Sequence, residues 1–149
     1  MAWYWAYGKD MEEAELRRRC PGARKVAKAK LPTAKPEFLE VDGEPVFAVT
    51  RDEKQDAWGI LYFVDDVELL NVRVGAKGRR LTYRPVWDEE NRAYNAYLLE
   101  ADEGLAPATP SKETLERLVG RATAAGLPEK YVGILGAIKT ASAKAEASA

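Results

Sequence analysis

The chain opens with an aromatic run that stops at a glycine. Trp3, Trp5 and Tyr7 alternate along residues 3–7, so in an extended segment they lie on one face. Large aromatic side chains in an extended run are typical of a buried strand. Gly8 follows at once, and a glycine allows the chain to turn sharply because it lacks a Cβ atom. The run predicts a buried first strand that ends in a turn, around which the rest of the chain packs.

The residues after the turn indicate a helix. Asp10 is a suitable N-cap because its carboxylate can accept hydrogen bonds from the first free N–H groups of a helix, and Glu13 completes a capping-box pattern. We expect this helix to cover residues 10–20. A strand, a glycine turn and a helix start leave backbone N–H groups free near Gly8, where they suit a carboxylate or a developing oxyanion.

Two residue types that carry much enzyme chemistry are scarce. Among the 149 residues there is no histidine, which excludes His-based triads, His general bases and most zinc or iron sites. Cys20 is the single cysteine, so the chain can form neither an intrachain disulfide nor a cysteine metal cluster. Without a His partner, Cys20 fits a buried structural thiol better than a nucleophile. We therefore expect no metal and no cofactor.

The length and composition are those of one globular domain, with 46% hydrophobic and 32% charged residues. No apolar run reaches the ~20 residues of a membrane span, and no secretory signal is visible. A cytoplasmic location is therefore the default expectation. We expect a folded domain at residues 1–139, followed by a small, polar, disordered tail at residues 140–149.

Hydrophobic patterning predicts the remaining elements. Further strands are expected at residues 23–31, 38–41, 45–50, 57–64, 81–87 and 92–99. Pro32 and Pro36 bracket a predicted loop, and Asp42-Gly43 is a hairpin turn signal. Helices are expected at residues 65–71, between Pro110 and Gly126, and after Pro128.

Four short motifs follow one another in a characteristic order. They are residues 7–11 (Tyr-Gly-Lys-Asp-Met), 18–23 (Arg-Arg-Cys-Pro-Gly-Ala), 58–62 (Trp-Gly-Ile-Leu-Tyr) and 125–131 (Ala-Gly-Leu-Pro-Glu-Lys-Tyr). Together they resemble the gamma-glutamyl cyclotransferase-like family over residues 3–138, although the first motif of that family usually reads Tyr-Gly-Ser-Asn. The order and spacing of the motifs carry the resemblance, rather than any one of them.

The resemblance implies a fold and a reaction. The fold is α+β, a small and largely closed mixed β-barrel or sheet of about six strands with flanking helices, in which the Gly8 turn opens into a cavity beside Val74. In the reaction, the free α-amine of a γ-glutamyl compound attacks its own γ-carbonyl, releasing 5-oxoproline and an amine. Such a reaction needs a carboxylate for proton transfer and backbone donors for the oxyanion. In this family the carboxylate is a Glu in a Leu-Asp-x-x-Glu-Gly pattern.

The chain departs from the family at this pattern. The pattern aligns on residues 70–75, where Val74 takes the place of the Glu and Asn71 that of the Asp. Valine cannot transfer a proton, and loss of a positioned acid–base group typically costs ~10²–10⁴-fold in rate. Lys9 replaces the family Ser in the turn, where its cation would crowd or neutralise the substrate pocket. We therefore assign no catalytic residue, and whether the chain is an enzyme stays open.

A relocated carboxylate keeps the enzymatic alternative open. Glu44 and Glu100 can reach a cavity from neighbouring strands, and the sequence favours neither. Tyr94 and Tyr97 compete in the same way for the position of the family's second-half tyrosine. An active chain of this kind would release 5-oxoproline from a γ-glutamyl amine or peptide, or cleave a related amide.

The distribution of charge suggests a binding role. Residues 16–36 contain eight Lys or Arg and no acid, and residues 69–87 contain five and again no acid. Two solvated faces would explain this segregation; the more specific interpretation is a cation-lined site at the former cyclotransferase mouth. That site suits a small anionic or γ-glutamyl-like ligand or an acidic protein partner, but not nucleic acid, because the aromatic residues lie in core strands. The candidate binding residues are Tyr7, Gly8, Lys9, Asp10, Arg73 and Arg79.

Overall fold

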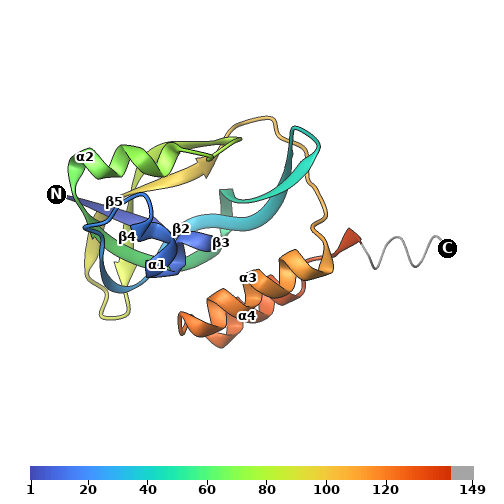
Figure 1. Cartoon of the computed structure of the whole chain (residues 1–149). Coiled ribbons are helices and arrows are strands. Elements are labelled where there is room, and N and C mark those ends of the chain that lie inside the picture. Colours follow the sequence, from blue (N-terminus) through green and yellow to red (C-terminus); the bar gives the residue numbers. More distant parts are fainter. Residues whose placement is uncertain (142–149) are drawn as a thin grey trace.

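The computed structural model describes residues 1–141, and its centre is a closed five-stranded β-barrel (Figure 1). The strands are β1 (Ala2–Ala6), β2 (Arg24–Val41), β3 (Glu44–Val64), β4 (Arg79–Asp88) and β5 (Ala93–Ala101). Their order is β1-β3-β2-β4-β5, and a parallel contact between Tyr4 of β1 and Tyr97 of β5 closes the barrel. The other neighbouring strands are antiparallel. The expected α+β barrel is confirmed, whereas residues 142–149 of the predicted tail lie outside the described part of the chain.

β2 and β3 are each one long strand, where the sequence predicted shorter separate ones. They join at the Asp42-Gly43 turn, whose positive φ angles of 52° and 80° are those of a two-residue hairpin turn. The predicted loop between Pro32 and Pro36 is wrong. Thr33 takes a positive φ of 58° at a shift of register, so β2 passes the prolines as a bulged strand. The seven segments predicted as strands therefore form five strands, against the about six that the resemblance implied.

The β4–β5 hairpin forms where it was predicted, and one side chain locks its turn. The Asp88 carboxylate accepts hydrogen bonds from the backbone N–H groups of Glu90 and Arg92, both at 2.9 Å. It also accepts from Arg92 Nε at 2.8 Å and from the Tyr94 hydroxyl at 3.0 Å. Burial raises the pKa of Asp88, but these hydrogen bonds outweigh burial and bring the pKa down to about 2.

Short helical segments surround the turn after β1. They are the 3₁₀ turn η1 (Lys9–Met11), α1 (Glu13–Arg17), α2 (Asp66–Leu69) and the 3₁₀ turn η2 (Leu70–Arg73). The helix predicted over residues 10–20 is thus shorter, and Asp10 is not its N-cap. Gly8 and Glu12 occupy the two cap positions, neither with a side-chain hydrogen bond. Asp10 instead lies inside η1 with its carboxylate turned inward.

The last two helices lie together beside the barrel (Figure 1). They are α3 (Lys112–Ala124) and α4 (Glu129–Gly136), in the positions that the sequence predicted. The Ser111 hydroxyl caps α3 by accepting the Thr114 N–H at 3.1 Å. Gly126 follows α3 with a φ of 74°, which is a common way to end a helix.

The interior is apolar and holds the single thiol. The fully buried Trp5 donates its indole N–H to the Ala29 carbonyl at 3.0 Å, which joins β1 to β2 through the core. Cys20 is also fully buried, and its thiol donates to the Glu68 carbonyl at 3.2 Å. Burial raises the pKa of this thiol to about 11, as fits a structural cysteine. Within residues 1–141, no helix is long and apolar enough to cross a membrane.

Candidate functional site

A small cavity lies beside the turn that follows β1; we call it the Gly8 cavity. Its volume is about 30 Å³, roughly the space of one or two water molecules. Gly8 and Val74 both line it, as the resemblance implied. Of the candidate binding residues, Arg73 alone is absent from its wall. The lining residues are Tyr4, Tyr7, Gly8, Lys9, Asp10, Arg19, Val72, Val74, Gly75, Ala76, Arg79 and Leu99.

Gly8 contributes space rather than an unusual backbone conformation. Its φ is −120°, outside the left-handed region that favours glycine. A Cβ atom added here would lie 3.7 Å from Phe47 Cδ2, an ordinary contact distance. The Gly8 carbonyl accepts the Met11 N–H at 3.0 Å, which starts η1. The turn is where the sequence predicted it, but it does not depend on backbone angles that only glycine adopts.

An internal ion pair shapes one wall of the cavity. Asp10 is buried, and one carboxylate oxygen accepts a short hydrogen bond from the Arg19 guanidinium. The other oxygen accepts the Tyr4 hydroxyl at 3.2 Å. Arg19 also donates to the Val72 carbonyl at 3.2 Å, so the pair connects η1 to η2. Both oxygens of Asp10 are therefore already used within the protein.

A second wall is built by Tyr7 and Arg79. Tyr7 is buried, and its hydroxyl donates a short hydrogen bond to the Leu99 carbonyl of β5. Burial raises the pKa of Tyr7, and the neighbouring Arg79 guanidinium partly opposes this by lowering it. Arg79 Nε is buried and has no hydrogen-bond partner among residues 1–141. Arg79 thus lies beside the cavity with part of its hydrogen-bonding capacity unused.

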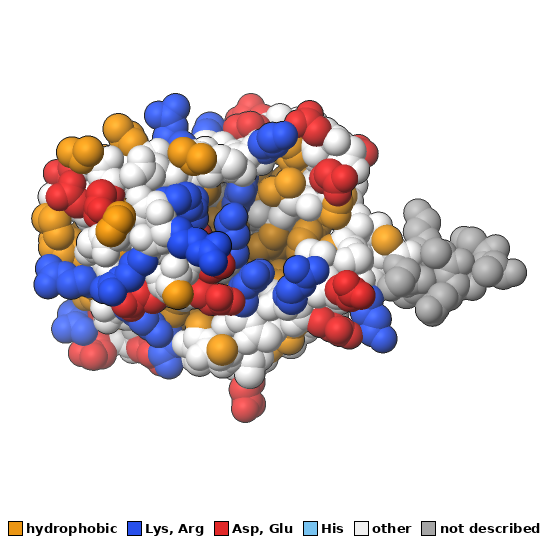
Figure 2. All heavy atoms as spheres, viewed as in Figure 1, with side chains coloured by type: hydrophobic (Ala, Val, Ile, Leu, Met, Phe, Trp, Pro, Cys, Tyr) orange, Lys and Arg blue, Asp and Glu red, His pale blue; other side chains and the backbone are white. Residues whose placement is uncertain are grey.

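Beyond Arg79 the surface opens into a wider depression, which we call the basic hollow. It has a volume of about 570 Å³ and is lined by Arg73, Arg79, Arg80 and Leu81. This is where the structure places Arg73, on the rim rather than in the cavity. Figure 2 shows Lys and Arg side chains gathered near the middle of the face drawn.

Cations exceed anions around the Gly8 cavity. Lys9, Arg19 and Arg79 line it together with a single carboxylate, that of Asp10. Arg19 is paired with that carboxylate, whereas no ion pair joins Lys9 or Arg79 to an acid in the described part of the chain. The site thus has an unbalanced positive charge, as the charge pattern of the sequence suggested.

Among the described residues, no free carboxylate lines the Gly8 cavity. Val74 follows η2 with 69% of its surface exposed, at the cavity's edge. Glu68, close in sequence, accepts the Gly22 N–H at 2.9 Å instead of reaching the cavity. Glu44 is exposed at the start of β3 and does not line the cavity. Asp10 is therefore the one acid in the cavity wall among the described residues.

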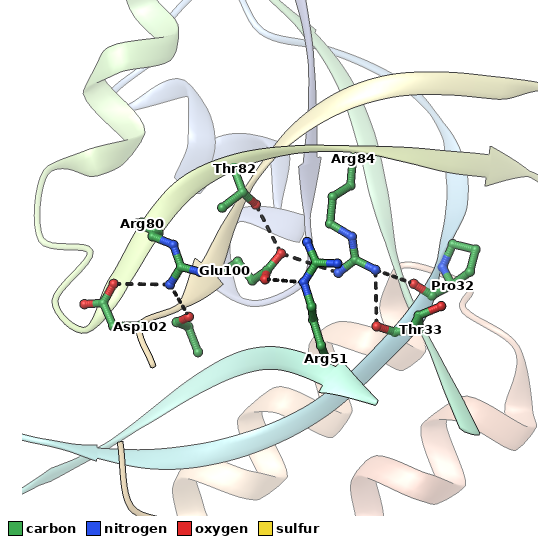
Figure 3. A network of polar contacts seen from close by, with 9 residues as sticks. Pro32, Thr33, Arg51, Arg80, Thr82, Arg84, Glu100 and Asp102 are labelled. Carbon is green, nitrogen blue, oxygen red and sulfur yellow. Dashed lines mark hydrogen bonds and ion pairs between the residues drawn. The ribbon is translucent and has the colours of Figure 1, made fainter. Parts of the chain in front are cut away.

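Glu100, the other candidate for a relocated carboxylate, belongs to a separate group of residues (Figure 3). Its side chain is 4% exposed, and its carboxylate accepts from Thr82 Oγ1 at 3.2 Å, Arg51 Nε at 3.3 Å and Arg84 Nη1 at 3.4 Å. Of these residues, Arg51 and Glu100 border a different cavity of about 250 Å³. We call the group the Glu100 cluster: Arg51, Arg80, Thr82, Arg84, Glu100 and Asp102.

The sequence identified part of the cavity's polar wall and missed the rest. Tyr94 and Tyr97, proposed for the family's tyrosine, do not line the cavity; Tyr94 donates to Asp88, and Tyr97 stacks on Tyr83 with ring centroids 4.6 Å apart. Tyr4 and Arg19 were not predicted to contribute. Arg19 had a usable signal, since it belongs to the acid-free basic segment that follows the turn.

Comparison with known proteins supports the architecture. No protein-family model matches the chain, and no curated protein matches it significantly. Among solved structures, one described as gamma-glutamyl cyclotransferase matches with a TM-score of 0.82 and 19% sequence identity. The match covers 93% of this chain and 88% of the chain of that structure. The uncharacterized protein loc79017 from Homo sapiens gives the same values.

A third solved structure is similar over the same share of this chain. YkqA from Bacillus subtilis has a TM-score of 0.73 and 16% identity, and covers 93% of this chain but 55% of its own. At such identities, similarity establishes the fold alone. The closed barrel, its flanking helices and these similarities together show that the chain has the gamma-glutamyl cyclotransferase fold.

Proposed function

We propose that this chain is a divergent gamma-glutamyl cyclotransferase-like protein that binds a small anionic or amino-acid-like ligand at the Gly8 cavity and the basic hollow, and is not an efficient cyclotransferase. The guanidinium of Arg79 is the observation that carries this proposal. Arg79 borders both the cavity and the hollow, its Nε is buried without an acceptor, and no described carboxylate pairs with it. A partly desolvated cation without an acidic partner is unfavourable, and a bound anion would offset that cost.

The dimensions suit a ligand with a small charged head group. The Gly8 cavity, at about 30 Å³, is too small for a whole γ-glutamyl compound but comparable to a carboxylate group. The hollow beyond Arg79, at about 570 Å³, has room for the remainder of such a ligand. There, Arg73 offers a further cationic donor and Leu81 an apolar contact.

Proton transfer has no suitable group at this site. A general base must reach the proton that it removes. Val74 cannot act in this way, and both oxygens of Asp10 already accept hydrogen bonds from Arg19 and Tyr4. We therefore expect release of 5-oxoproline from γ-glutamyl-alanine to fall well below the common enzymatic range of about 1–10³ s⁻¹. Turnover within that range would favour the alternative function, an active enzyme with Asp10 or another carboxylate as its base.

Isothermal titration with matched ligands tests the binding proposal. The ligands are 5-oxoproline, glutamate and inorganic phosphate, with 2-pyrrolidinone as the analogue of 5-oxoproline that lacks the carboxylate. Arg79→Gln should weaken binding of the anions by about 10- to 100-fold, the worth of a charged hydrogen bond. Arg117→Gln, an exposed arginine on α3, is the control and should change nothing. Equal binding of 2-pyrrolidinone, or unchanged anion affinities in Arg79→Gln, would overturn the proposal.

A rescue experiment asks whether the rest of an active site is intact. The double variant Val74→Glu with Lys9→Ser restores the residues that the resembling family carries at these positions. A gain in 5-oxoproline release over the unmodified chain would mean that the missing carboxylate is what limits catalysis. The matched control is Val67→Glu, an exposed valine on α2 that does not line the cavity.

A further inference from the structure

The segment from α2 to the end of η2 is apolar on two opposite sides. Leu69 and Val72 are buried and fix the segment to the barrel. Val67, Leu70 and Val74 point the other way, with 78%, 57% and 69% of their surfaces exposed. Polar residues separate the two sides, namely Asp66, Glu68, Asn71 and Arg73. The outer side of this segment is open among the described residues.

The three exposed side chains form a row. They follow one another along the segment: Val67 lies on α2, Leu70 begins η2, and Val74 comes just after η2, where the backbone is extended. In Figure 2, apolar side chains stand out along the upper edge of the molecule, where Figure 1 shows α2, with Lys and Arg side chains among them. We call Val67, Leu70 and Val74 the outer row. Contiguous exposed apolar groups of this kind mark interaction surfaces more often than isolated ones do.

Unpaired positive charge adjoins the outer row. Arg73 lies within the row's span, is exposed, and has no ion pair with a described acid. The three nearby acids already have partners: Asp65 accepts the Val67 N–H at 2.9 Å, Asp66 pairs with the N-terminal ammonium at 2.8 Å, and Glu68 accepts the Gly22 N–H at 2.9 Å. Val74 also borders the Gly8 cavity, so the row leads directly towards the basic hollow. A complementary surface must therefore be both apolar and acidic.

We infer that the outer row and the basic hollow dock an acidic peptide segment of a partner protein, with apolar side chains on the row and a carboxylate in the hollow. A peptide fits better than a membrane, because a concave hollow receives a projecting acidic side chain whereas a lipid surface passes over it. The row consists of two valines and one leucine, so it lacks the aromatic anchors of interfacial segments. The part of this inference that concerns Arg79 rests on the proposed function. The part that concerns the outer row does not.

A peptide-display selection tests the inference without knowing the partner. A random peptide library is selected on the wild-type chain, with counter-selection on the double variant Val67→Ser, Leu70→Ser. Enriched peptides should combine Asp or Glu with Leu, Ile or Phe. Fluorescence anisotropy with a synthetic copy should then show about a tenfold loss of affinity in Leu70→Ser. Ile134→Ser, which alters an exposed apolar residue on α4, should leave the affinity unchanged.

Several outcomes would overturn the inference. They are a selection that yields no enriched peptide, enriched peptides without acids, or binding insensitive to Leu70→Ser. Vesicles of phosphatidylserine and phosphatidylcholine that bind the wild type but not the double variant would point to a membrane instead. A dimer by sedimentation that the double variant dissociates would point to a second copy. If 5-oxoproline still binds through Arg79 while peptides fail, the proposed function survives and only the docking inference is lost.

Discussion

The Gly8 cavity and the Glu100 cluster lie at the same end of the β4–β5 hairpin and handle charge in opposite ways. Arg79 and Leu99 line the cavity, and the next residues along each strand, Arg80 and Glu100, belong to the cluster. Consecutive residues of a strand face opposite sides. One pair of strands thus separates the two regions, and each region contains a buried carboxylate held by an arginine.

The two regions differ in whether their basic side chains have acidic partners. In the Glu100 cluster, Arg51 and Arg84 contact Glu100, and Arg80 lies 3.7 Å from Asp102. Arg84 also donates to the carbonyls of Pro32 and Thr33, so it joins β4 to the bulge of β2. In the Gly8 cavity, Asp10 pairs with Arg19, and Lys9 and Arg79 have no acidic partner among the described residues. The arginines of the Glu100 cluster are thus used within the fold, whereas Arg79 has no acidic partner within residues 1–141.

The largest expected effect is the difference in stability between two variants, Arg84→Met and Arg79→Met. Arg84→Met leaves the buried Glu100 with Thr82 and the exposed Arg51 as partners, and removal of one partner of a buried pair costs about 3–5 kcal/mol. Arg79→Met removes a cation with no acidic partner and should change the free energy of unfolding by less than about 1 kcal/mol. Urea unfolding of both variants measures the difference. Equal losses of stability would show that Arg79 is structural and undermine the distinction.

A second substitution should move stability and binding in opposite directions. Asp10→Asn keeps an acceptor for the Tyr4 hydroxyl but removes the negative partner of Arg19. We expect a loss of about 1.5–3 kcal/mol in unfolding free energy, the range for a hydrogen bond to a charged group. Because the cavity then has one anion fewer, affinity for 5-oxoproline should rise by about tenfold. Weaker anion binding in this variant would mean that Asp10, rather than the surplus of cations, holds the ligand.

The smallest effect is expected at the rim. Arg73→Ala should weaken anion binding by about two- to threefold at low salt, because exposed charges are largely screened by water and ions. The difference should vanish as the salt concentration rises. Lys77→Ala is the matched control, since Lys77 already lies 3.9 Å from Asp42. A loss in Arg73→Ala as large as that in Arg79→Gln, and independent of salt, would place the ligand in the hollow alone.

Local signals predicted much of the fold, and long-range pairing explains the failures. The β4–β5 hairpin, α3 and α4 were predicted from alternation, helical spacing and the Gly126 stop. The unbroken β2 was not, because prolines usually interrupt strands and only pairing with β3 carries the chain past the Thr33 bulge. Such pairing depends on residues far apart in sequence, which patterns within one segment do not reveal.

The same limit applies to the site. Arg79 was identified from an acid-free basic segment, and the Gly8–Val74 proximity from the resemblance. The role of Asp10 was predicted wrongly because a capping motif is local, whereas its actual partner, Arg19, lies beyond the end of α1. Asp10 is a buried ion-pair partner rather than a helix cap because its carboxylate points inward. There, Arg19 and Tyr4 satisfy its hydrogen-bonding capacity.

The most direct test of the central claim is an NMR titration that observes the arginine Nε–Hε groups of both regions at once. Protein labelled with nitrogen-15 is titrated with 5-oxoproline, and the Arg79 and Arg51 signals are assigned by Arg79→Lys and Arg51→Lys variants. The account predicts that the Arg79 signal shifts with saturation, while that of Arg51, already donated to Glu100, stays in place. A shift at Arg51 with none at Arg79 would contradict it.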